Sequence, residues 1–200
     1  VIEDGATLQY GVGAIPAAIL NALGGHKDLG LHSGLITDEI IDLVENGVIT
    51  NARKAVHTGI SVGAIAIAGP RLKDFLHLNA DFQMHPSSTT HGPATLSQID
   101  NLVAMNSALE VDIYGQVNAE QVGDRYLGAI GGQVDFMHAA TTAAKGISMI
   151  AFVTTARTDV DMVITEYGIA DLRGKTLEDR ARSIIDIALP EHREELATHI

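Results

Sequence analysis

Three glycines gather in residues 128–136, the segment GAIGGQVDF, just before a stretch of helical pattern over residues 134–144. Glycine has no Cβ, so a ligand can lie against its backbone, and it can adopt positive φ angles. A helix that begins just beyond adds unpaired N–H donors and a field that favours an anion or an oxyanion. The segment therefore predicts either an anion-binding turn or a tight strand-to-helix turn that binds no ligand.

A second glycine turn, residues 11–16 with the sequence GVGAIP, follows a strand-like stretch over residues 6–10. It matches half of the dinucleotide-binding fingerprint, in which glycines let a pyrophosphate approach the start of a helix. Pro16 stands where the third glycine of the fingerprint would be, and no acidic residue ends a second strand about 20 residues further on. The pattern therefore disfavours a nicotinamide cofactor.

His91 lies in the polar segment SSTTHGP, residues 87–93, and imidazole titrates close to neutral pH. Its side chain either donates a hydrogen bond to a bound carbonyl or carboxylate or simply holds the loop, and the sequence leaves both roles open. The chain has nine histidines, but none shows the i, i+4 spacing of a helical zinc motif. His85 and His91 form only a loop pair, so we expect no metal site.

The composition is that of one soluble domain, with 46% hydrophobic and 19% charged residues among 200. A formal charge of −12 disfavours a nucleic-acid partner, and the absence of cysteine excludes disulfides and thiolate nucleophiles. The longest apolar runs, such as residues 60–68, are too short to span a bilayer. We therefore expect a cytoplasmic protein. The chain begins VIED, without an initiator Met or a secretory signal, so we also expect it to be a fragment.

Strand-like and helix-like stretches alternate along the chain. Strand patterns cover residues 6–10, 60–68, 108–114, 147–153 and 160–164, and helix patterns cover residues 17–23, 38–46, 72–78, 94–101, 134–144, 176–188 and 190–198. Thr37 is the expected N-cap of the second helix. This alternation predicts an α/β fold with a largely parallel sheet flanked by helices, in which ligands gather at the carboxyl ends of the strands. Both glycine turns follow such ends.

Five motifs in this order resemble the C-terminal domain of the acetyl-CoA hydrolase/transferase family, which includes 4-hydroxybutyrate and succinyl-CoA:acetate CoA-transferases. They are GVGAIP at residues 11–16, VAMNSALEVD at 103–112, GQVN at 115–118, GAIGGQVDF at 128–136 and TEYGIADLRG at 165–174. The likeness covers nearly the whole chain. It implies the CoA-transferase-like fold of two similar α/β domains, in which residues 1–200 form the second and an N-terminal domain completes the site. It also implies a cytoplasmic enzyme of acetate metabolism that forms a homo-oligomer such as a dimer.

In this family a glutamate attacks the acyl-CoA carbonyl, and a second carboxylate resolves the anhydride and the glutamyl-CoA thioester that follow. Covalent catalysis of this kind splits one hard acyl transfer into two easier steps, whose tetrahedral intermediates need oxyanion donors. The resemblance implies a coenzyme A thioester as substrate, a carboxylate as acceptor and no covalently bound cofactor. It places CoA-contacting or oxyanion-binding roles on Gly11, Val12, Gly13, Asn106, Gly128, Gly131, Gly132 and Gln133, and a polar position beside the acyl group on His91.

One departure from the family concerns its nucleophile. The glutamate belongs in the motif His-Ser/Thr-Glu, but this chain has His32-Ser33-Gly34, and Gly34 has no side chain that could form a thioester. The nearest carboxylates, Asp38 and Glu39, come about one helical turn later, so they replace the glutamate only if the backbone is shifted. Three hypotheses stay open: an enzyme subfamily that uses activated water or another carboxylate, a non-catalytic CoA-binding or subunit-assembly domain, and an altered residue. We favour the first, acting on a short-chain acyl-CoA such as acetyl-CoA or 4-hydroxybutyryl-CoA.

A second departure concerns the segment MIAFVTT, residues 149–155, which joins Ala151 directly to Phe152. The family has a Gly/Ser/Thr-rich loop between the two strands expected here, and two strands need a connection of at least a few residues. We therefore expect that a loop is missing from the sequence between residues 151 and 152, and that this loop closes over CoA.

Overall fold

A computed structural model describes residues 1–126, 128, 131–152 and 159–200. An eight-stranded sheet forms its centre, in the order β12-β11-β10-β5-β1-β2-β3-β4. Neighbouring strands are parallel except for β11 and β12, which pair antiparallel. The strands of this sheet are β1 (Thr7–Tyr10), β2 (Gly30–Ile36), β3 (Ser61–Ala66), β4 (Phe82–Met84), β5 (Leu102–Ala108), β10 (Ile147–Phe152), β11 (Met162–Thr165) and β12 (Gly168–Asp171).

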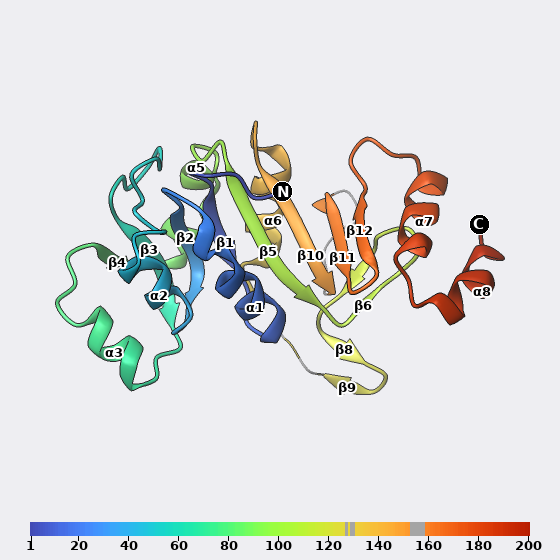
Figure 1. Ribbon diagram of the computed structural model, residues 1–200, viewed down its shortest axis with the longest axis horizontal. Coiled ribbons are helices and arrows are strands. Elements are labelled where there is room, and N and C mark those ends of the chain that lie inside the picture. The colour runs from blue at the N-terminus through green and yellow to red at the C-terminus, as the bar shows by residue number, and fades with distance from the viewer. Residues whose placement is uncertain (127, 129–130, 153–158) are drawn as a thin grey trace.

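Two short antiparallel hairpins follow β5. They are formed by β6 (Glu110–Val111) with β7 (Val117–Asn118), and by β8 (Gln121–Val122) with β9 (Arg125–Tyr126). The second hairpin lies beyond the carboxyl ends of β5 and β10, at the bottom of Figure 1.

Helices cover both faces of the large sheet (Figure 1). They are α1 (Ala14–Ala22), η1 (Leu23–Gly25), α2 (Ile40–Glu45), α3 (Pro70–Leu76), α4 (Ser87–Thr90), α5 (Pro93–Leu96), α6 (Gln133–Thr142), α7 (Leu177–Asp186), η3 (Pro190–His192) and α8 (Arg193–Ala197). Buried side chains of α1, α2 and α3 join one apolar cluster, and those of α5, α6 and α7 join another. The expected α/β fold with a largely parallel sheet is confirmed.

Strand β5 separates the two apolar clusters. Its residues Val103 and Met105 belong to the cluster under α1, whereas Leu102 and Ala104 belong to the cluster under α6. A parallel strand that is buried on both faces shows a nearly continuous apolar run and not an alternating one. This explains why the sequence patterns miss β5: the expected helix 94–101 ends at Leu96, and the expected strand 108–114 starts where β5 ends.

Two other expectations about elements were wrong or incomplete. Strand β2 was not predicted, and Thr37 is not the N-cap of α2, which begins at Ile40 after Glu39. The backbone N–H of Thr37 instead donates to the Tyr10 hydroxyl, 2.9 Å away, so this residue fixes β2 to the end of β1. The strand expected over residues 147–153 matches β10, apart from Val153, which lies outside the described residues.

The strand order reverses between β1 and β5. From β1 the chain continues through β2, β3 and β4 on one side, and it then returns through α4 and α5 to form β5 on the other side of β1. At such a switch point a crevice opens outside the carboxyl ends of the two strands, and open α/β sheets bind ligands there. The first glycine turn follows β1 directly, and Asn106 and Ser107 stand near the end of β5. The fold therefore brings the first glycine turn and Asn106 to the switch point.

Candidate functional site

The imidazole of His91 lies between two glycines at the carboxyl edge of the sheet. A Cβ placed on Gly34 in β2 would be 2.8 Å from His91 Nε2, and a Cβ on Gly132 would be 2.0 Å from the same atom. The ring also packs against Phe136 of α6, with 4.8 Å between the ring centroids. Side chains at positions 34 and 132 are therefore incompatible with the observed place of this ring, and three segments far apart in sequence meet around it.

Thr90 fixes the other side of the ring. Its Oγ1 lies 2.7 Å from His91 Nδ1, and its carbonyl oxygen accepts a hydrogen bond from His32 Nε2 at 3.0 Å. His32 is fully buried, and this burial lowers its pKa to about 4, so the ring is neutral at pH 7. Thr90, itself fully buried, thus connects a neutral structural histidine to the histidine at the edge of the sheet.

Asn106 connects the first glycine turn to α6. Its amide forms a reciprocal pair with the Gln9 amide, with Gln9 Nε2 donating to Asn106 Oδ1 at 3.2 Å and Asn106 Nδ2 donating to Gln9 Oε1 at 3.0 Å. Asn106 Nδ2 also contacts Met137 Sδ at 3.3 Å. A Cβ on Gly11 would lie only 2.9 Å from Asn106 Oδ1. The buried side chain therefore holds the turn and the helix together at the switch point.

The first glycine turn adopts a backbone that favours glycine. Gly13 has φ 127°, serves as the N-cap of α1 and has no side chain to cap the helix. Ser107 Oγ donates to the Val12 carbonyl oxygen at 3.2 Å, which pins the turn to the end of β5. Val12 itself is 57% exposed. The turn thus exposes backbone and the start of a helix at the carboxyl edge of the sheet.

In the second glycine segment, residues 128–132, close packing explains two of the glycines. Positive φ was expected to matter, but Gly132 has φ −71°. Gly128 is needed because a Cβ there would lie 2.5 Å from the Ala119 carbonyl oxygen, and Gly132 is needed because of His91. A Cβ on Gly131 would meet nothing within 4 Å among the residues that the structure describes. Helix α6 begins at Gln133, directly after Gly132, and no described side chain forms a capping hydrogen bond to it.

The two carboxylates nearest to Gly34 in sequence point elsewhere. Asp38 Oδ2 lies 3.3 Å from the position of a Cβ on Gly69. Glu39 lines a cavity of about 40 Å³ together with Tyr10 and the first glycine turn, which is room for about one water molecule. Glu39 Oε2 is buried and has no hydrogen-bond partner among the described residues. The nearest atoms to the Gly34 Cβ position belong to His91 and Phe136, so an imidazole and not a carboxylate fills this space.

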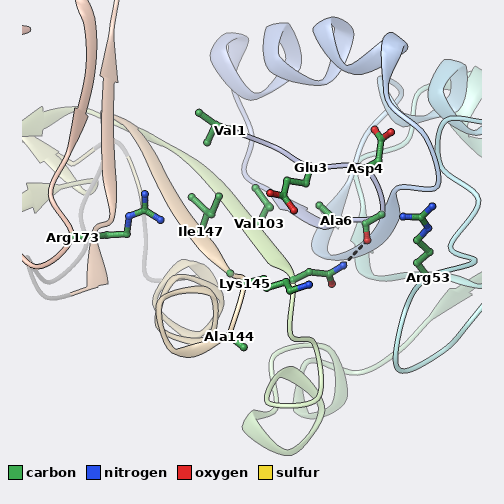
Figure 2. Close-up of a pocket in the computed structure, with 13 residues that line it drawn as sticks. Val1, Glu3, Asp4, Ala6, Arg53, Val103, Ala144, Lys145, Ile147 and Arg173 are labelled. Atoms are coloured by element: carbon green, nitrogen blue, oxygen red, sulfur yellow. Dashed lines mark hydrogen bonds between the residues drawn. The ribbon is translucent and has the colours of Figure 1, made fainter.

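A larger cavity of about 520 Å³ lies at the opposite edge of the sheet (Figure 2). It is lined by residues at the amino ends of β1, β5 and β10 and by three cationic side chains. Arg53 is paired with Asp28 at 3.2 Å, and Arg173 is paired with Asp171 through two hydrogen bonds of 3.0 and 2.6 Å. Ligands of open α/β sheets bind at the carboxyl edge, so this cavity is not the candidate site despite its size.

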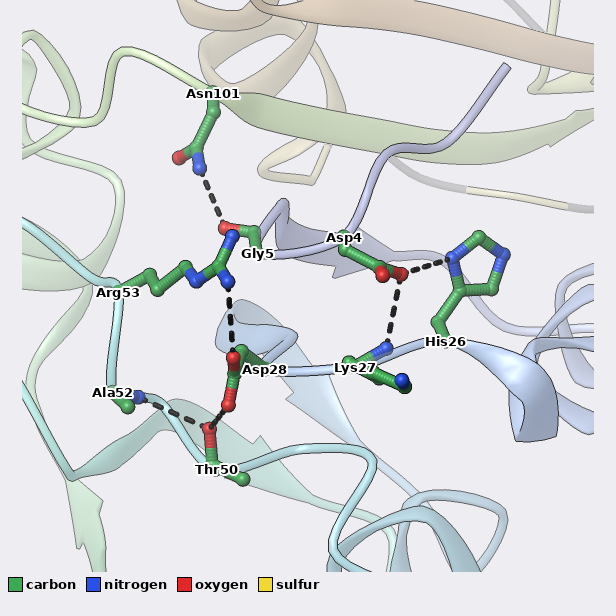
Figure 3. A network of polar contacts seen from close by, with 9 residues as sticks. All are labelled: Asp4, Gly5, His26, Lys27, Asp28, Thr50, Ala52, Arg53 and Asn101. Atoms are coloured by element: carbon green, nitrogen blue, oxygen red, sulfur yellow. Dashed lines mark hydrogen bonds and ion pairs between the residues drawn. The ribbon is translucent and has the colours of Figure 1, made fainter.

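Polar contacts beside the larger cavity fix the first residues of the chain (Figure 3). Asp4 Oδ1 accepts a hydrogen bond from the backbone N–H of Lys27 at 3.0 Å, and it also lies 3.2 Å from His26 Nδ1. The Gly5 carbonyl oxygen accepts from Asn101 Nδ2 at 2.6 Å. These contacts tie the start of the chain to the segments that lead into β2 and β5.

The sequence profile of the acetyl-CoA hydrolase/transferase C-terminal domain matches residues 69–155 and 147–200. The chain belongs to this family. Curated relatives over nearly the whole chain agree. The 4-hydroxybutyrate coenzyme A transferase of Clostridium kluyveri is 42% identical over 217 aligned positions, which cover 98% of this chain and 51% of that protein. The acetyl-CoA hydrolase of Saccharomyces cerevisiae is 30% identical, over 92% of this chain and 38% of that protein.

Solved structures of the acetyl-CoA hydrolase/transferase family share the fold. The crystal structure of 4-hydroxybutyrate CoA-transferase from Porphyromonas gingivalis superposes with a TM-score of 0.86 and 35% identity, covering 99% of this chain and 51% of that one. The chain thus spans about half the length of this structure and of the transferase from Clostridium kluyveri. The family resemblance inferred from the five motifs is confirmed.

The structure groups most, but not all, of the predicted site residues. Gly11 meets Asn106, and Gly34 and Gly132 meet His91, whereas Gly128 packs against the loop around Ala119. Sequence reasoning missed the residues that position the site, namely Gln9, Thr90 and Phe136. Gln9 gave a usable signal, because it is a polar residue within the short strand-like stretch that forms the buried strand β1.

Within the described residues, no group of three or more His, Asp or Glu side chains is arranged to hold a metal ion. No helix in the same part of the chain is long and apolar enough to cross a membrane.

Proposed function

We propose that this chain is the C-terminal half of an enzyme that transfers or hydrolyses the acyl group of a short-chain acyl-CoA. The observation that carries the proposal is the place of His91, held between Gly34 and Gly132 at the carboxyl edge of the sheet. The first glycine turn lies at the switch point of the same edge. Relatives named as CoA-transferases and acetyl-CoA hydrolases support the same class of substrate, such as acetyl-CoA or 4-hydroxybutyryl-CoA.

The proposed site uses backbone donors to hold the thioester. The turn of Gly11, Val12 and Gly13 and the start of α6 at Gly131, Gly132 and Gln133 supply N–H groups at two helix N-termini, which suit an oxyanion or a phosphate. We assign Asn106 the role of holding these two segments in place. Gly128 shapes the hairpin that leads into α6. Coenzyme A enters as part of the substrate, and the proposal includes no covalently bound cofactor.

Gly34 decides which chemistry the site supports. Covalent transfer through a carboxylate at this position needs a side chain, and the space beside Gly34 holds the His91 ring. We therefore propose a reaction route without a glutamyl thioester at position 34. The second candidate function, a CoA-binding or assembly domain without turnover, is favoured by this same glycine.

Incubation of the full-length protein with acetyl-CoA, with and without acetate or another carboxylate acceptor, tests the proposal. Acceptor-dependent exchange supports transfer, and release of free CoA without an acceptor supports hydrolysis. CoA binding in a calorimeter without either reaction supports the second candidate. Absence of both turnover and CoA binding contradicts the whole assignment.

We further infer that the natural protein is longer than this chain in two places. The relatives are about twice as long, which fits an N-terminal domain that completes the site. The alignment with the Clostridium kluyveri protein has 217 positions, more than the 200 residues here, so that relative carries additional residues inside the aligned stretch. The family profile matches in two pieces that overlap at residues 147–155, which supports a missing loop between 151 and 152. The complete coding sequence tests both points.

We also propose a cytoplasmic homo-oligomer, such as a dimer, as the state of the whole protein. Its measured mass in solution, by light scattering on the full-length protein, tests this: twice the chain mass is expected, and a monomer contradicts it.

A further inference from the structure

We propose that the cavity beside the first glycine turn receives the end of the acyl group, and that Glu39 and Tyr10 select an uncharged acyl group that ends in a hydroxyl. The inference rests on the proposed function and deepens it, because it names the class of acyl group that the site accepts. Three observations carry it: a carboxylate oxygen without a partner, a phenol hydroxyl in the same cavity, and a cavity wall that includes the glycine turn.

The first observation concerns the carboxylate of Glu39. Its Oε2 atom is buried, although the residue as a whole is only half-buried, and no described residue donates a hydrogen bond to this atom. Among the described residues, no Arg, Lys or His forms an ion pair with Glu39. Native proteins rarely keep a buried acceptor without a partner, because it costs free energy. The atom is therefore suited to a donor that a ligand supplies.

The second observation concerns Tyr10, which lines the same cavity as Glu39. The Tyr10 hydroxyl accepts hydrogen bonds from the Thr37 backbone N–H at 2.9 Å and from Thr37 Oγ1 at 3.4 Å, which leaves its own hydrogen for donation. Burial raises the pKa of Tyr10 to about 12, with a smaller contribution from the charge of Glu39, so the hydroxyl keeps its proton at pH 7. A ligand hydroxyl, which both donates and accepts, complements this carboxylate and this phenol.

The third observation concerns the position and size of the cavity. Gly11, Val12 and Gly13, the turn proposed to hold the thioester, form part of its wall, and Ala17 and Leu20 of α1 add apolar surface. The volume is about 40 Å³, which limits the cavity to the last atoms of a short chain. An acyl chain that leaves the thioester at the turn therefore enters a small cavity whose polar groups are the carboxylate and the phenol hydroxyl.

These groups predict a ranking of acyl groups with the same number of carbon atoms. The end of a 4-hydroxybutyryl group can donate to Glu39 Oε2 and accept from the Tyr10 hydroxyl. A butyryl group leaves both polar atoms without a partner, which is unfavourable in a site built from buried polar groups. A succinyl group brings a second carboxylate next to Glu39, and like charges repel strongly where water is excluded. We therefore expect the order 4-hydroxybutyryl, butyryl, succinyl.

A bound water molecule is the rival occupant of the cavity, because water also donates and accepts hydrogen bonds. If such a water stays in place when the substrate binds, the acyl end remains outside the cavity, and Glu39 does not affect the choice of substrate. The variant Glu39→Gln separates the two cases, because it removes the charge and keeps the length of the side chain.

Steady-state kinetics of the full-length protein with the three acyl-CoAs test the proposal, with and without acetate so that transfer and hydrolysis are both recorded. We expect kcat/KM for 4-hydroxybutyryl-CoA to exceed that for butyryl-CoA about tenfold, the usual effect of a hydrogen bond to a charged group, and that for succinyl-CoA about 100-fold or more. In Glu39→Gln the preference for butyryl-CoA over succinyl-CoA should fall at least tenfold. The matched control Glu45→Gln removes an exposed carboxylate from α2 and should keep the wild-type ratios.

A second variant tests the donor in the cavity. Tyr10→Phe removes the hydroxyl and keeps the ring, so it should lower the preference for 4-hydroxybutyryl-CoA over butyryl-CoA about three- to tenfold. Because each ratio compares substrates on the same protein sample, a partly unfolded variant does not change it. Equal kcat/KM for the three acyl-CoAs in the wild type, or wild-type ratios in either cavity variant, would overturn the inference while the proposed function stands. If neither these acyl-CoAs nor acetyl-CoA are turned over, the proposed function fails and the inference fails with it.

Discussion

Gly34 and His91 share one space: a Cβ on the glycine would lie 2.8 Å from the histidine Nε2. The residue type at one of these positions therefore restricts which side chains fit at the other. A glutamate at position 34 needs the ring to move, and the present position of the ring needs a glycine. The absence of a carboxylate at position 34 is thus coupled to the place of the His91 imidazole.

This coupling predicts a non-additive double mutant. Gly34→Ala alone should destabilise the domain by about 1–3 kcal/mol, because the added methyl forces the ring or the strand to shift. In a His91→Gly background the same change should cost much less, since the obstructing ring is gone. Urea unfolding of the four proteins measures the coupling, and Gly24→Ala, where a Cβ meets nothing within 4 Å, is the matched control. Equal costs in both backgrounds would mean that the two residues do not share this space.

The backbone of the first glycine turn predicts a binding defect. Gly13 has φ 127°, so Gly13→Ala should strain the turn by about 1–3 kcal/mol and tilt the N–H groups at the start of α1. We expect CoA affinity in the full-length protein to fall at least tenfold by calorimetry, whereas Gly24→Ala should bind as the wild type does. Unchanged CoA affinity in the Gly13 variant would remove this turn from the site.

The reciprocal amide pair predicts a stability effect in the core of the site. Asn106→Ala leaves the buried Gln9 amide without its partner, which should cost about 1–3 kcal/mol. Replacing both residues by Leu should cost less than the sum of the two single replacements, because no buried polar group is then left unpaired. Thermal and urea unfolding measure these costs, with the exposed Asn21→Ala in α1 as control. A cost for Asn106→Ala no larger than that of the control would show that the pair is not formed.

The buried amine of Lys54 should make the stability of the domain depend on pH. Its Nζ is buried and donates to the carbonyl oxygens of Leu31 and Ile60 at 2.8 and 2.6 Å, and burial lowers its pKa to about 7. In the unfolded chain the pKa is about 10.4, so the unfolded state binds more protons between pH 7 and 10. The contribution of Lys54 to the free energy of unfolding therefore rises with pH across that window, by an amount on the order of 4 kcal/mol in total. Below pH 7 the folded protein carries the charged amine and bears the full cost of burying it.

The measurement compares urea unfolding at pH 7 and pH 9.5 in the wild type and in Lys54→Met. The difference in free energy of unfolding between the two proteins should shift in favour of the wild type as the pH rises. Lys73→Met, which removes an exposed lysine of α3, should show no such shift. A constant difference across the window would mean that Lys54 keeps its charge in the folded state.

Much of the fold follows from sequence patterns, because amphipathic helices and capped ends are local properties. Helix α7 is an example: Thr176 caps it by accepting from the Asp179 N–H at 3.2 Å, and Ile184 and Ile185 form its buried stripe. Strand β5 could not be predicted in this way, since burial on both faces removes the alternation that marks a strand. Local patterns work where one face meets water and fail in the centre of the sheet.

The site was predictable in part for a similar reason. Glycine turns and His91 stand out in sequence, but nothing in the sequence shows that Gly34, Gly132 and His91 meet, because that depends on how β2, α6 and α4 pack. The same packing explains why residue 132 is a glycine: a side chain there would collide with His91. The sequence had suggested a positive φ angle as the reason instead. Contacts between distant segments thus explain both what was missed and why the glycine segment matters.

We propose that this site breaks an acyl-CoA thioester without a nucleophilic side chain at position 34. The most direct test is the intact mass of the full-length protein, quenched with borohydride during turnover of acetyl-CoA. We predict that free CoA accumulates while the protein mass stays unchanged, because no acyl or CoA group is ever bound to a side chain. A mass shift from a reduced glutamyl thioester or a retained CoA adduct would contradict the account.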